Sequence, residues 1–194
     1  IIDDTVVYRY PESDGYLFVP NAGHDEEMAN HWSECAHNMG LSVSIENVTQ
    51  DTGLFAVQGP EAMDTVEDAA ANKLSDLSRF EAKQSEIAGI NCLIARTGYT
   101  GEDGVEIFCP ASGSESVWSE FQSVQPCGLG ARDILRMEAG LLLSSQDFDP
   151  ETEARTPIEA KLQFFVDLSK PDFVGQESLK TQQADGTEQK LIGL

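Results

Sequence analysis

The sequence predicts an α+β fold, in which helices and strands mix without the regular alternation that builds a parallel sheet. Two patterns carry this prediction. Short apolar or alternating runs, typical of strands, are separated by turn-forming residues, and longer stretches repeat apolar side chains three and four positions apart, as amphipathic helices do. The 194 residues, 40% of them hydrophobic, are enough for one full-sized domain or two small ones.

The N-terminal part predicts a β-hairpin followed by a helix. Residues 5–9 and 16–19 are typical of strands, and they flank the turn-forming stretch 11–15. The next apolar stripe predicts a helix that ends at Gly40. Its members are Met28, Trp32, Cys35, Ala36 and Met39.

The middle of the chain predicts further strands and a polar helix. Alternating apolar residues at 41–45 indicate a half-buried strand, and the apolar run 54–57 indicates another. A helix is expected over residues 60–71. Strands over 91–97 and 105–109 follow, on either side of a glycine-containing loop.

Two helices and a strand complete the expected elements. Apolar residues between positions 117 and 124 indicate a helix with Ser112 or Ser114 as its cap. Residues 131–141 indicate a second helix, and residues 164–168 a last strand.

The charge balance is strongly acidic, with 34 acidic against 12 basic side chains and a net charge of −22. Such a chain repels nucleic acids and anionic lipids, which are bound mainly through Lys and Arg. The acids are dispersed in pairs and triplets, which indicates a solvated surface. Concentrated salt screens such repulsion, so we expect adaptation to high intracellular salt.

The cysteines and the chain ends suggest where the protein resides and how complete it is. Four cysteines without C-x-x-C spacing are expected to be free thiols. The sequence shows neither a secretory signal nor a long apolar run, so we expect a cytoplasmic protein. It starts without Met and stops in a strand-like pattern, so we expect a fragment of a longer protein.

The glycine-rich loop at residues 96–106 is the strongest candidate site. Its acids would repel a phosphate, whereas a carboxylate such as Glu106 can accept two parallel hydrogen bonds from an amidine-like edge. Tyr99 offers a flat aromatic face and a hydroxyl group. From the residues alone, an exposed acidic hairpin turn is the other interpretation, and composition by itself favours it.

A second candidate is the helix over residues 128–140. It carries Arg132 and Arg136 four positions apart, which is informative in so acidic a chain. The two arginines could serve a ligand, or they could pair with Asp133 and Glu138 on the same helix.

The adjacent carboxylates Asp3 and Asp4 are a third candidate. At the start of a strand one of them must point inward, where burial can shift its pKa and fit it for proton transfer. No metal site is predicted, because the three histidines do not share a helical face and zinc needs at least three convergent ligands.

Five stretches, in order, resemble signatures of the glycine cleavage system aminomethyltransferases, the T-protein family. They are residues 2–4, 19–23, 96–106, 128–140, and 156–160 with 172–177. The resemblance implies interwoven α/β subdomains with antiparallel sheets that form part of a folate-binding fold over residues 1–143. It also implies a linker with strand and helix over 144–194, leading to a C-terminal β-barrel domain that this chain lacks.

The same resemblance implies a function. Family members transfer the one-carbon unit of an aminomethyl group, carried on the lipoyl arm of H-protein, to tetrahydrofolate and release ammonia. By motif position, Asp4 is implied as the catalytic carboxylate, and Asn21, Tyr99, Glu106 and Arg132 as folate-binding residues. Tetrahydrofolate is the implied acceptor substrate and lipoylated H-protein the implied partner, with no metal, nucleic acid or membrane.

Two alternatives belong to the same superfamily. A non-catalytic folate-binding protein of the iron–sulfur assembly type carries a Lys-Gly-Cys-Tyr motif followed by Gly-Gln, and the stretch RTGYTGE at residues 96–102 departs from it. A folate-dependent demethylase module would follow a dinucleotide-binding domain upstream of residue 1.

Overall fold

The computed structural model describes residues 1–10 and 14–192. By their contacts these residues form two compact units. The larger unit comprises Thr5–Leu141, and the smaller unit comprises Ile1–Asp4 together with Leu142–Leu194. The fold is mixed α/β with antiparallel sheets, as predicted.

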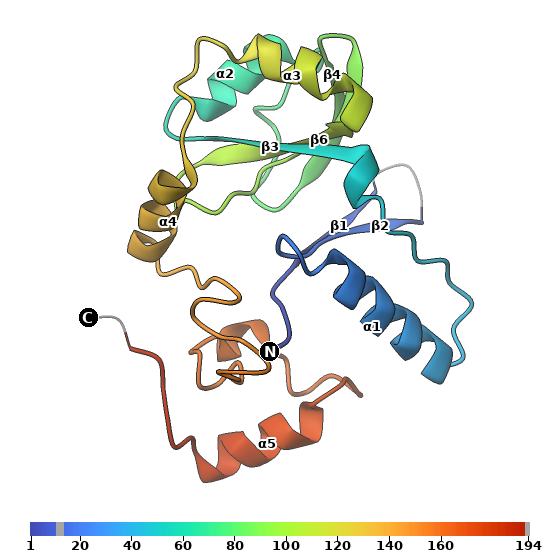
Figure 1. The fold of residues 1–194 in the computed structure, drawn as a ribbon, viewed down its shortest axis with the longest axis vertical. Coiled ribbons are helices and arrows are strands. Elements are labelled where there is room, and N and C mark those ends of the chain that lie inside the picture. Colours follow the sequence, from blue (N-terminus) through green and yellow to red (C-terminus); the bar gives the residue numbers. More distant parts are fainter. Residues whose placement is uncertain (11–13, 193–194) are drawn as a thin grey trace. The chain divides into compact units, whose positions relative to one another are not determined.

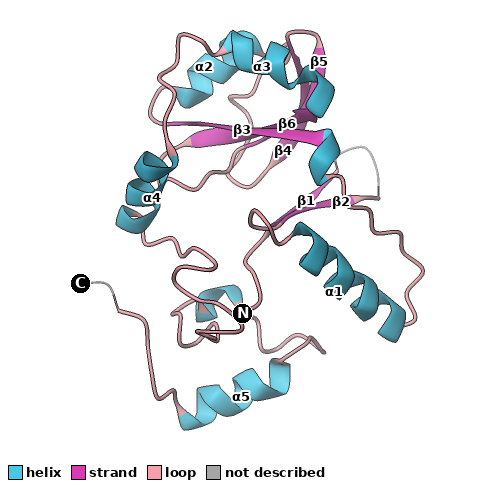
Figure 2. Ribbon diagram, viewed as in Figure 1, coloured by secondary structure: helices cyan, strands magenta, loops and turns pink. Residues whose placement is uncertain are grey.

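Most elements belong to the larger unit (Figures 1 and 2). They are β1 (Val6–Arg9), β2 (Tyr16–Val19), α1 (Asp25–Asn38), the 3-10 helix η1 (Thr49–Asp51), β3 (Thr52–Gln58), α2 (Ala62–Ala69), β4 (Ala82–Ile87), β5 (Ile90–Ala95), β6 (Gly104–Pro110), the 3-10 helix η2 (Ala111–Gly113), α3 (Ser114–Glu120) and α4 (Leu129–Glu138).

A four-stranded antiparallel sheet with the order β3-β6-β5-β4 is the centre of this unit. β4 and β5 form a hairpin whose turn residues Ala88 and Gly89 both have positive φ, 52° and 75°, as a type I′ turn requires. In the centre of the sheet, Glu106 of β6 lies opposite Ala56 of β3 and Ala95 of β5.

One face of the sheet is covered by α2 and α3 and forms the main core (Figure 1). Apolar side chains from alternate positions of the strands point toward these helices, and burying them from water stabilises the sheet. Ile87, Ile94, Val105 and Ile107 are among the fully buried members, each with 0% of its surface exposed.

The hairpin β1–β2 packs on the other face of the sheet. Its inward-facing side chains join a second core cluster with Leu93, Ala95 and Phe108. Tyr8 is only 3% exposed, and its ring makes an edge-on contact with Phe108 at 5.6 Å between centroids. Strand alternation puts Glu106 on the same face as Phe108, so Tyr8 and Glu106 share this layer.

Several predicted elements are confirmed to within a few residues. They are the hairpin strands, the helix that ends before Gly40, the strands at 54–57, 91–97 and 105–109, and the helices near 60–71 and 131–141. Residues 11–13 of the predicted hairpin turn lie outside the described residues. Strand β4 was not predicted.

The strand predicted at residues 41–45 is wrong. These residues have no regular structure, and Leu41, Val43 and Ile45 are 54%, 61% and 37% exposed. Alternation produces a strand only where a neighbour completes its hydrogen bonds, and no strand among the described residues pairs with this segment. Its C-terminal end is held by Asn47, whose amide donates to Asp25 of α1 at 2.8 Å.

The helix predicted over 117–124 is α3, but neither predicted cap is correct. Its N-cap is Gly113, and no side chain caps the helix. Gly113 lies against Ile90, so that a Cβ here would come within 2.7 Å of that side chain. The residue before α3 is therefore determined by close packing against Ile90. Capping hydrogen bonds from Ser112 or Ser114 do not determine it.

The smaller unit contains the 3-10 helix η3 (Gln163–Phe165) and helix α5 (Gln176–Asp185). The strand predicted at 164–168 is therefore wrong. Phe164 and Phe165 are 73% and 75% exposed, and the centroids of their rings are 4.1 Å apart. The buried amide of Gln176 donates to the backbone oxygens of Leu168 and Lys170 and ties the start of α5 to the preceding turn.

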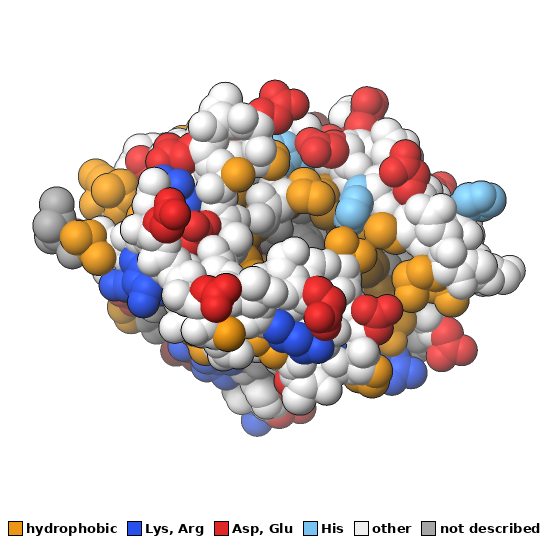
Figure 3. Space-filling model, turned by 90° about the horizontal axis from the view of Figure 1, so that it is seen from below, with side chains coloured by type: hydrophobic (Ala, Val, Ile, Leu, Met, Phe, Trp, Pro, Cys, Tyr) orange, Lys and Arg blue, Asp and Glu red, His pale blue; other side chains and the backbone are white. Residues whose placement is uncertain are grey.

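The surface agrees with the charge pattern of the sequence. Acidic side chains are scattered over the face shown in Figure 3 and do not gather in one block. Among the described residues, each helix is too short or too polar to cross a membrane.

Candidate functional site

The loop between β5 and β6 is clamped at its base by an ion pair. The guanidinium of Arg96 donates two parallel hydrogen bonds to Asp103, from Nε to Oδ1 at 3.0 Å and from Nη2 to Oδ2 at 2.6 Å. Nη1 donates to the backbone oxygen of Leu77 at 2.7 Å. One of the loop's acids is thus paired with an arginine of the same chain, and the hydrogen bonds from Arg96 hold the pKa of Asp103 below its usual value.

The side chain of Gln58, at the end of β3, braces the same loop. Its Nε2 donates to the backbone oxygens of Thr97 and Val105, both at 3.0 Å, and its Oε1 accepts from the hydroxyl of Thr100 at 3.0 Å. A Cβ on Gly98 would lie 1.8 Å from Gln58 Oε1. Glycine is needed there because the brace occupies the space, and the loop is therefore ordered before any ligand arrives.

We predict that the free energy of unfolding of the Asp103→Asn variant falls less steeply at acidic pH than that of the wild type. The pKa of Asp103 in the folded protein lies below its ordinary value, so the stabilisation is fully present above the ordinary pKa and is lost as the pH falls through the folded one. The variant should be less stable at neutral pH by about 0.5–1 kcal/mol, because the pair is partly exposed to solvent.

Urea unfolding of the full-length protein at several pH values tests this prediction. The matched control is Glu102→Gln, which removes an exposed acid of the same loop that has no side-chain partner among the described residues. If Asp103→Asn and the wild type lose stability in parallel below pH 4, the ion pair does not fasten the loop.

Glu106 belongs to a buried cluster with two hydroxyl groups. Its Oε2 accepts from Thr97 Oγ1 at 2.5 Å and from the Tyr8 hydroxyl at 3.1 Å, and the two hydroxyl oxygens are 2.6 Å apart. Thr97 is 8% exposed and Tyr8 3%. Burial, and then the negative charge of Glu106, raises the pKa of Tyr8 well above its ordinary value, so the phenol keeps its proton and donates it.

Tyr99 and Arg132, two of the predicted site residues, are brought together. The guanidinium carbon of Arg132 lies 5.8 Å from the centre of the Tyr99 ring, a cation–π geometry. The loop reaches α4 through Gly101, which has φ +77° and whose added Cβ would come within 2.7 Å of Ala139. The contact joins an aromatic surface to a positive charge beside the Glu106 loop.

The second arginine of α4 has a structural role. Arg136 is 4% exposed, and its Nε donates to Asp133 Oδ1 at 2.8 Å, one helical turn away. Its Nη1 also donates to the backbone oxygen of Leu141 at 3.2 Å. Pairing within the helix, one of the two interpretations left open by the sequence, therefore holds for Arg136, whereas Arg132 lies against Tyr99.

The remaining two predicted residues, Asn21 and Asp4, lie in other segments of the chain. Asn21 follows β2, is half-buried, and accepts from the backbone of His24 in the turn that leads into α1. Asp4 lies in the smaller unit and is exposed. Asp3 and Asp4 precede β1, so strand alternation does not decide their directions as expected; Asp3 is half-buried and its Oδ1 accepts from the backbone N–H of Asp4 at 3.0 Å.

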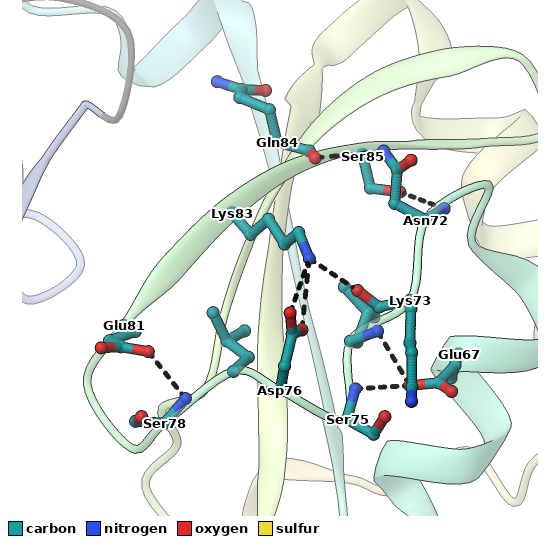
Figure 4. A network of polar contacts seen from close by, with 12 residues as sticks. Glu67, Asn72, Lys73, Ser75, Asp76, Ser78, Glu81, Lys83, Gln84 and Ser85 are labelled. Atoms are coloured by element: carbon teal, nitrogen blue, oxygen red, sulfur yellow. Dashed lines mark hydrogen bonds and ion pairs between the residues drawn. The ribbon is translucent and has the colours of Figure 1, made fainter.

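A groove of about 480 Å³ in the larger unit is lined by residues 7–9 of β1, which include Tyr8, and by residues 76–77 and 80–83. Figure 4 shows the polar network that shapes the loop beside it. Glu67 accepts from the backbone N–H groups of Leu74 and Ser75, and the Lys83 ammonium donates to Asp76. None of the predicted site residues lines this groove, and its Lys83 and Asp76 are paired with each other.

Sequence reasoning missed Tyr8, Thr97 and Gln58. Tyr8 has the signature of a core residue, because it alternates with Val6 on the inner face of the hairpin. Nothing in a local pattern indicates that its hydroxyl reaches Glu106. Among the described residues, no group of three or more His, Cys, Asp or Glu side chains is arranged to hold a metal ion.

Comparisons with known proteins complete the description of the site. A family model described as GCVT N-terminal domain matches residues 1–170. The chain is 50% identical over 194 residues to a probable aminomethyltransferase from Natronomonas pharaonis and 51% identical over 197 residues to one from Halobacterium salinarum. Both relatives come from halophilic archaea, in agreement with the acidic composition.

A solved structure is also similar. The crystal structure of glycine cleavage system aminomethyltransferase T from Bartonella henselae matches with a TM-score of 0.82 and 29% sequence identity, over 96% of this chain and 50% of that one. The curated relatives are matched over all of this chain but only 53% of their own length. The chain therefore spans about half the length of these proteins.

Proposed function

We propose that this chain, which belongs to the GCVT N-terminal domain family, forms the folate-binding part of an aminomethyltransferase of the glycine cleavage system. The complete enzyme would take the one-carbon unit of an aminomethyl group on the lipoyl arm of H-protein, transfer it to tetrahydrofolate, and release ammonia. Tetrahydrofolate is the acceptor substrate and lipoylated H-protein the partner in this proposal.

The observation that best supports this proposal is the environment of the Glu106 carboxylate. It is a half-buried carboxylate on β6, held by two buried hydroxyl groups, and the loop that precedes β6 is braced by Gln58. The 2-amino-4-oxo edge of a pterin presents adjacent N–H donors, and a carboxylate is their natural acceptor. Tyr99 supplies an aromatic surface and Arg132 a positive charge for the anionic glutamate end of the folate.

Asp4 is the proposed catalytic carboxylate. Positioned near the folate amines, it would orient the attacking amine and stabilise the iminium-like positive charge that develops as ammonia leaves. This is electrostatic catalysis, in which the carboxylate forms no covalent bond to the substrate. The assignment rests on the position of Asp4 in the family motif.

A cytoplasmic location is part of the same proposal. Cys35, Cys92, Cys109 and Cys127 are all free thiols, as expected of a reducing compartment.

The test is turnover by the full-length protein that contains this chain, in concentrated salt. With aminomethylated H-protein and tetrahydrofolate, we expect equal amounts of methylenetetrahydrofolate and ammonia to form. The tetrahydrofolate-dependent product must disappear when either H-protein or folate is left out. Folate binding without turnover would favour the non-catalytic folate-binding alternative, and an absence of folate binding would overturn the assignment.

A further inference from the structure

The two oxygens of the Glu106 carboxylate differ in the hydrogen bonds that they accept. Oε2 accepts from Thr97 and from Tyr8, whereas Oε1 accepts no hydrogen bond from any described residue. The other strand residues around Glu106 on this face are apolar or small: Ala95 and Ala56 are its neighbours across the sheet, and Phe108 is two residues along β6. The free oxygen is therefore the part of the carboxylate that a ligand can reach.

The distances fix one consistent order of donors. The shortest contact to the carboxylate is that of Thr97, at 2.5 Å, so the threonine proton points to Oε2. The Tyr8 hydroxyl then donates mainly to Thr97 Oγ1 at 2.6 Å and more weakly to Oε2 at 3.1 Å. The three groups form a chain in which Tyr8 acts on Glu106 through Thr97. Because both hydroxyl residues are buried, water does not readily take their place.

We propose that Tyr8 and Thr97 are positioning residues, which hold the Glu106 carboxylate in one orientation and so set the selectivity of the site for a ligand edge with adjacent N–H donors. The proposal rests on the proposed function, because that function supplies the ligand. Because Thr97 and, more weakly, Tyr8 donate to Oε2, the acceptor positions of the free Oε1 are held in a fixed plane. A ligand that lacks one N–H donor leaves a fixed acceptor unpaired, which a mobile carboxylate would avoid by turning toward water.

The readout is a ratio of affinities, measured on the full-length protein by calorimetry. The two probes are tetrahydrofolate and its analogue without the 2-amino group. Tyr8→Phe keeps the ring on Phe108 and removes only the hydroxyl, and Thr97→Val removes the other hydroxyl. Each variant is expected to lower the preference for tetrahydrofolate about threefold to tenfold. The double variant should lower the preference little further than Thr97→Val alone, because Tyr8 acts mainly through Thr97 and only weakly on Oε2 directly.

Two controls separate positioning from general damage. Thr97→Ser keeps the hydroxyl and should restore the preference, and Tyr10→Phe removes the hydroxyl of a partly buried tyrosine outside the cluster and should leave the ratio unchanged. An unchanged ratio in both Tyr8→Phe and Thr97→Val, with melting temperatures lowered, would overturn the positioning role while the function stands. A wild-type protein that does not bind tetrahydrofolate contradicts the proposed function itself.

Discussion

Replacing Glu106 with Gln in the full-length protein is expected to weaken tetrahydrofolate binding about tenfold to a hundredfold. Glutamine has the same shape, but one of its two terminal atoms is an amide nitrogen, which donates hydrogen bonds and cannot accept them. The charge-assisted bonds to the N–H donors of the ligand are lost, and one of these donors then faces another donor. Such bonds are about twice as strong as neutral ones, so this loss is larger than that expected for the hydroxyl variants.

The variant should fold, so that the loss can be assigned to binding. The amide oxygen can take the place of Oε2 and accept from the Thr97 and Tyr8 hydroxyl groups, so the buried cluster keeps its hydrogen bonds and the amide nitrogen faces the ligand. Calorimetric titration with tetrahydrofolate in concentrated salt gives the affinity, and Glu102→Gln is the matched control because it removes an exposed acid of the same loop. A Glu106→Gln affinity within twofold of wild type contradicts the assignment of Glu106 to the ligand.

Local patterns predicted those elements whose own side chains determine their structure. The stripe of α1 and the apolar run of β5 are examples, because each has an apolar face that must be buried wherever the segment lies. Strand β4 shows the limit. Its sequence AKQSEI is mostly polar, and only Ser85 and Ile87 are buried. It is a strand because it pairs with β5 at the edge of the sheet. This pairing cannot be predicted from the sequence of the segment itself.

The segment at 41–45 shows the converse error. Its alternating Leu41, Val43 and Ile45 form a strong local pattern, but no strand among the described residues supplies the missing hydrogen bonds. Pattern and pairing are separate conditions, and a strand needs both.

The candidate site, too, could be predicted only in part. Glu106 could be identified from the sequence because it lies in a short glycine-rich motif together with Tyr99. The cluster that holds it could not, because Tyr8 lies 98 positions before Glu106 and 89 before Thr97. A tyrosine on the inner face of a hairpin predicts burial, and burial predicts a partner for its hydroxyl, but the identity of the partner depends on how the hairpin docks on the sheet.

The Asp4→Asn substitution is expected to lower kcat about 100- to 1000-fold while the affinity for tetrahydrofolate changes less than threefold. The size of the loss follows from the proposed role, since a charge placed where positive charge develops stabilises the transition state more than the ground state. Asparagine keeps the shape of the side chain and removes that charge. The measurement is the rate of methylenetetrahydrofolate formation from aminomethylated H-protein, compared with folate affinity by calorimetry.

Asp3→Asn is the informative control, because the two carboxylates are adjacent and the motif alone separates them. The Asp3 side chain accepts from the backbone N–H of Asp4, and asparagine retains an oxygen for this bond, so Asp3→Asn should leave kcat within about fivefold of wild type. A larger loss in Asp3→Asn than in Asp4→Asn moves the catalytic role to the half-buried neighbour. A loss of folate affinity with unchanged kcat in Asp4→Asn makes Asp4 a binding residue, because a charge that acts equally on the ground and transition states cannot accelerate the reaction.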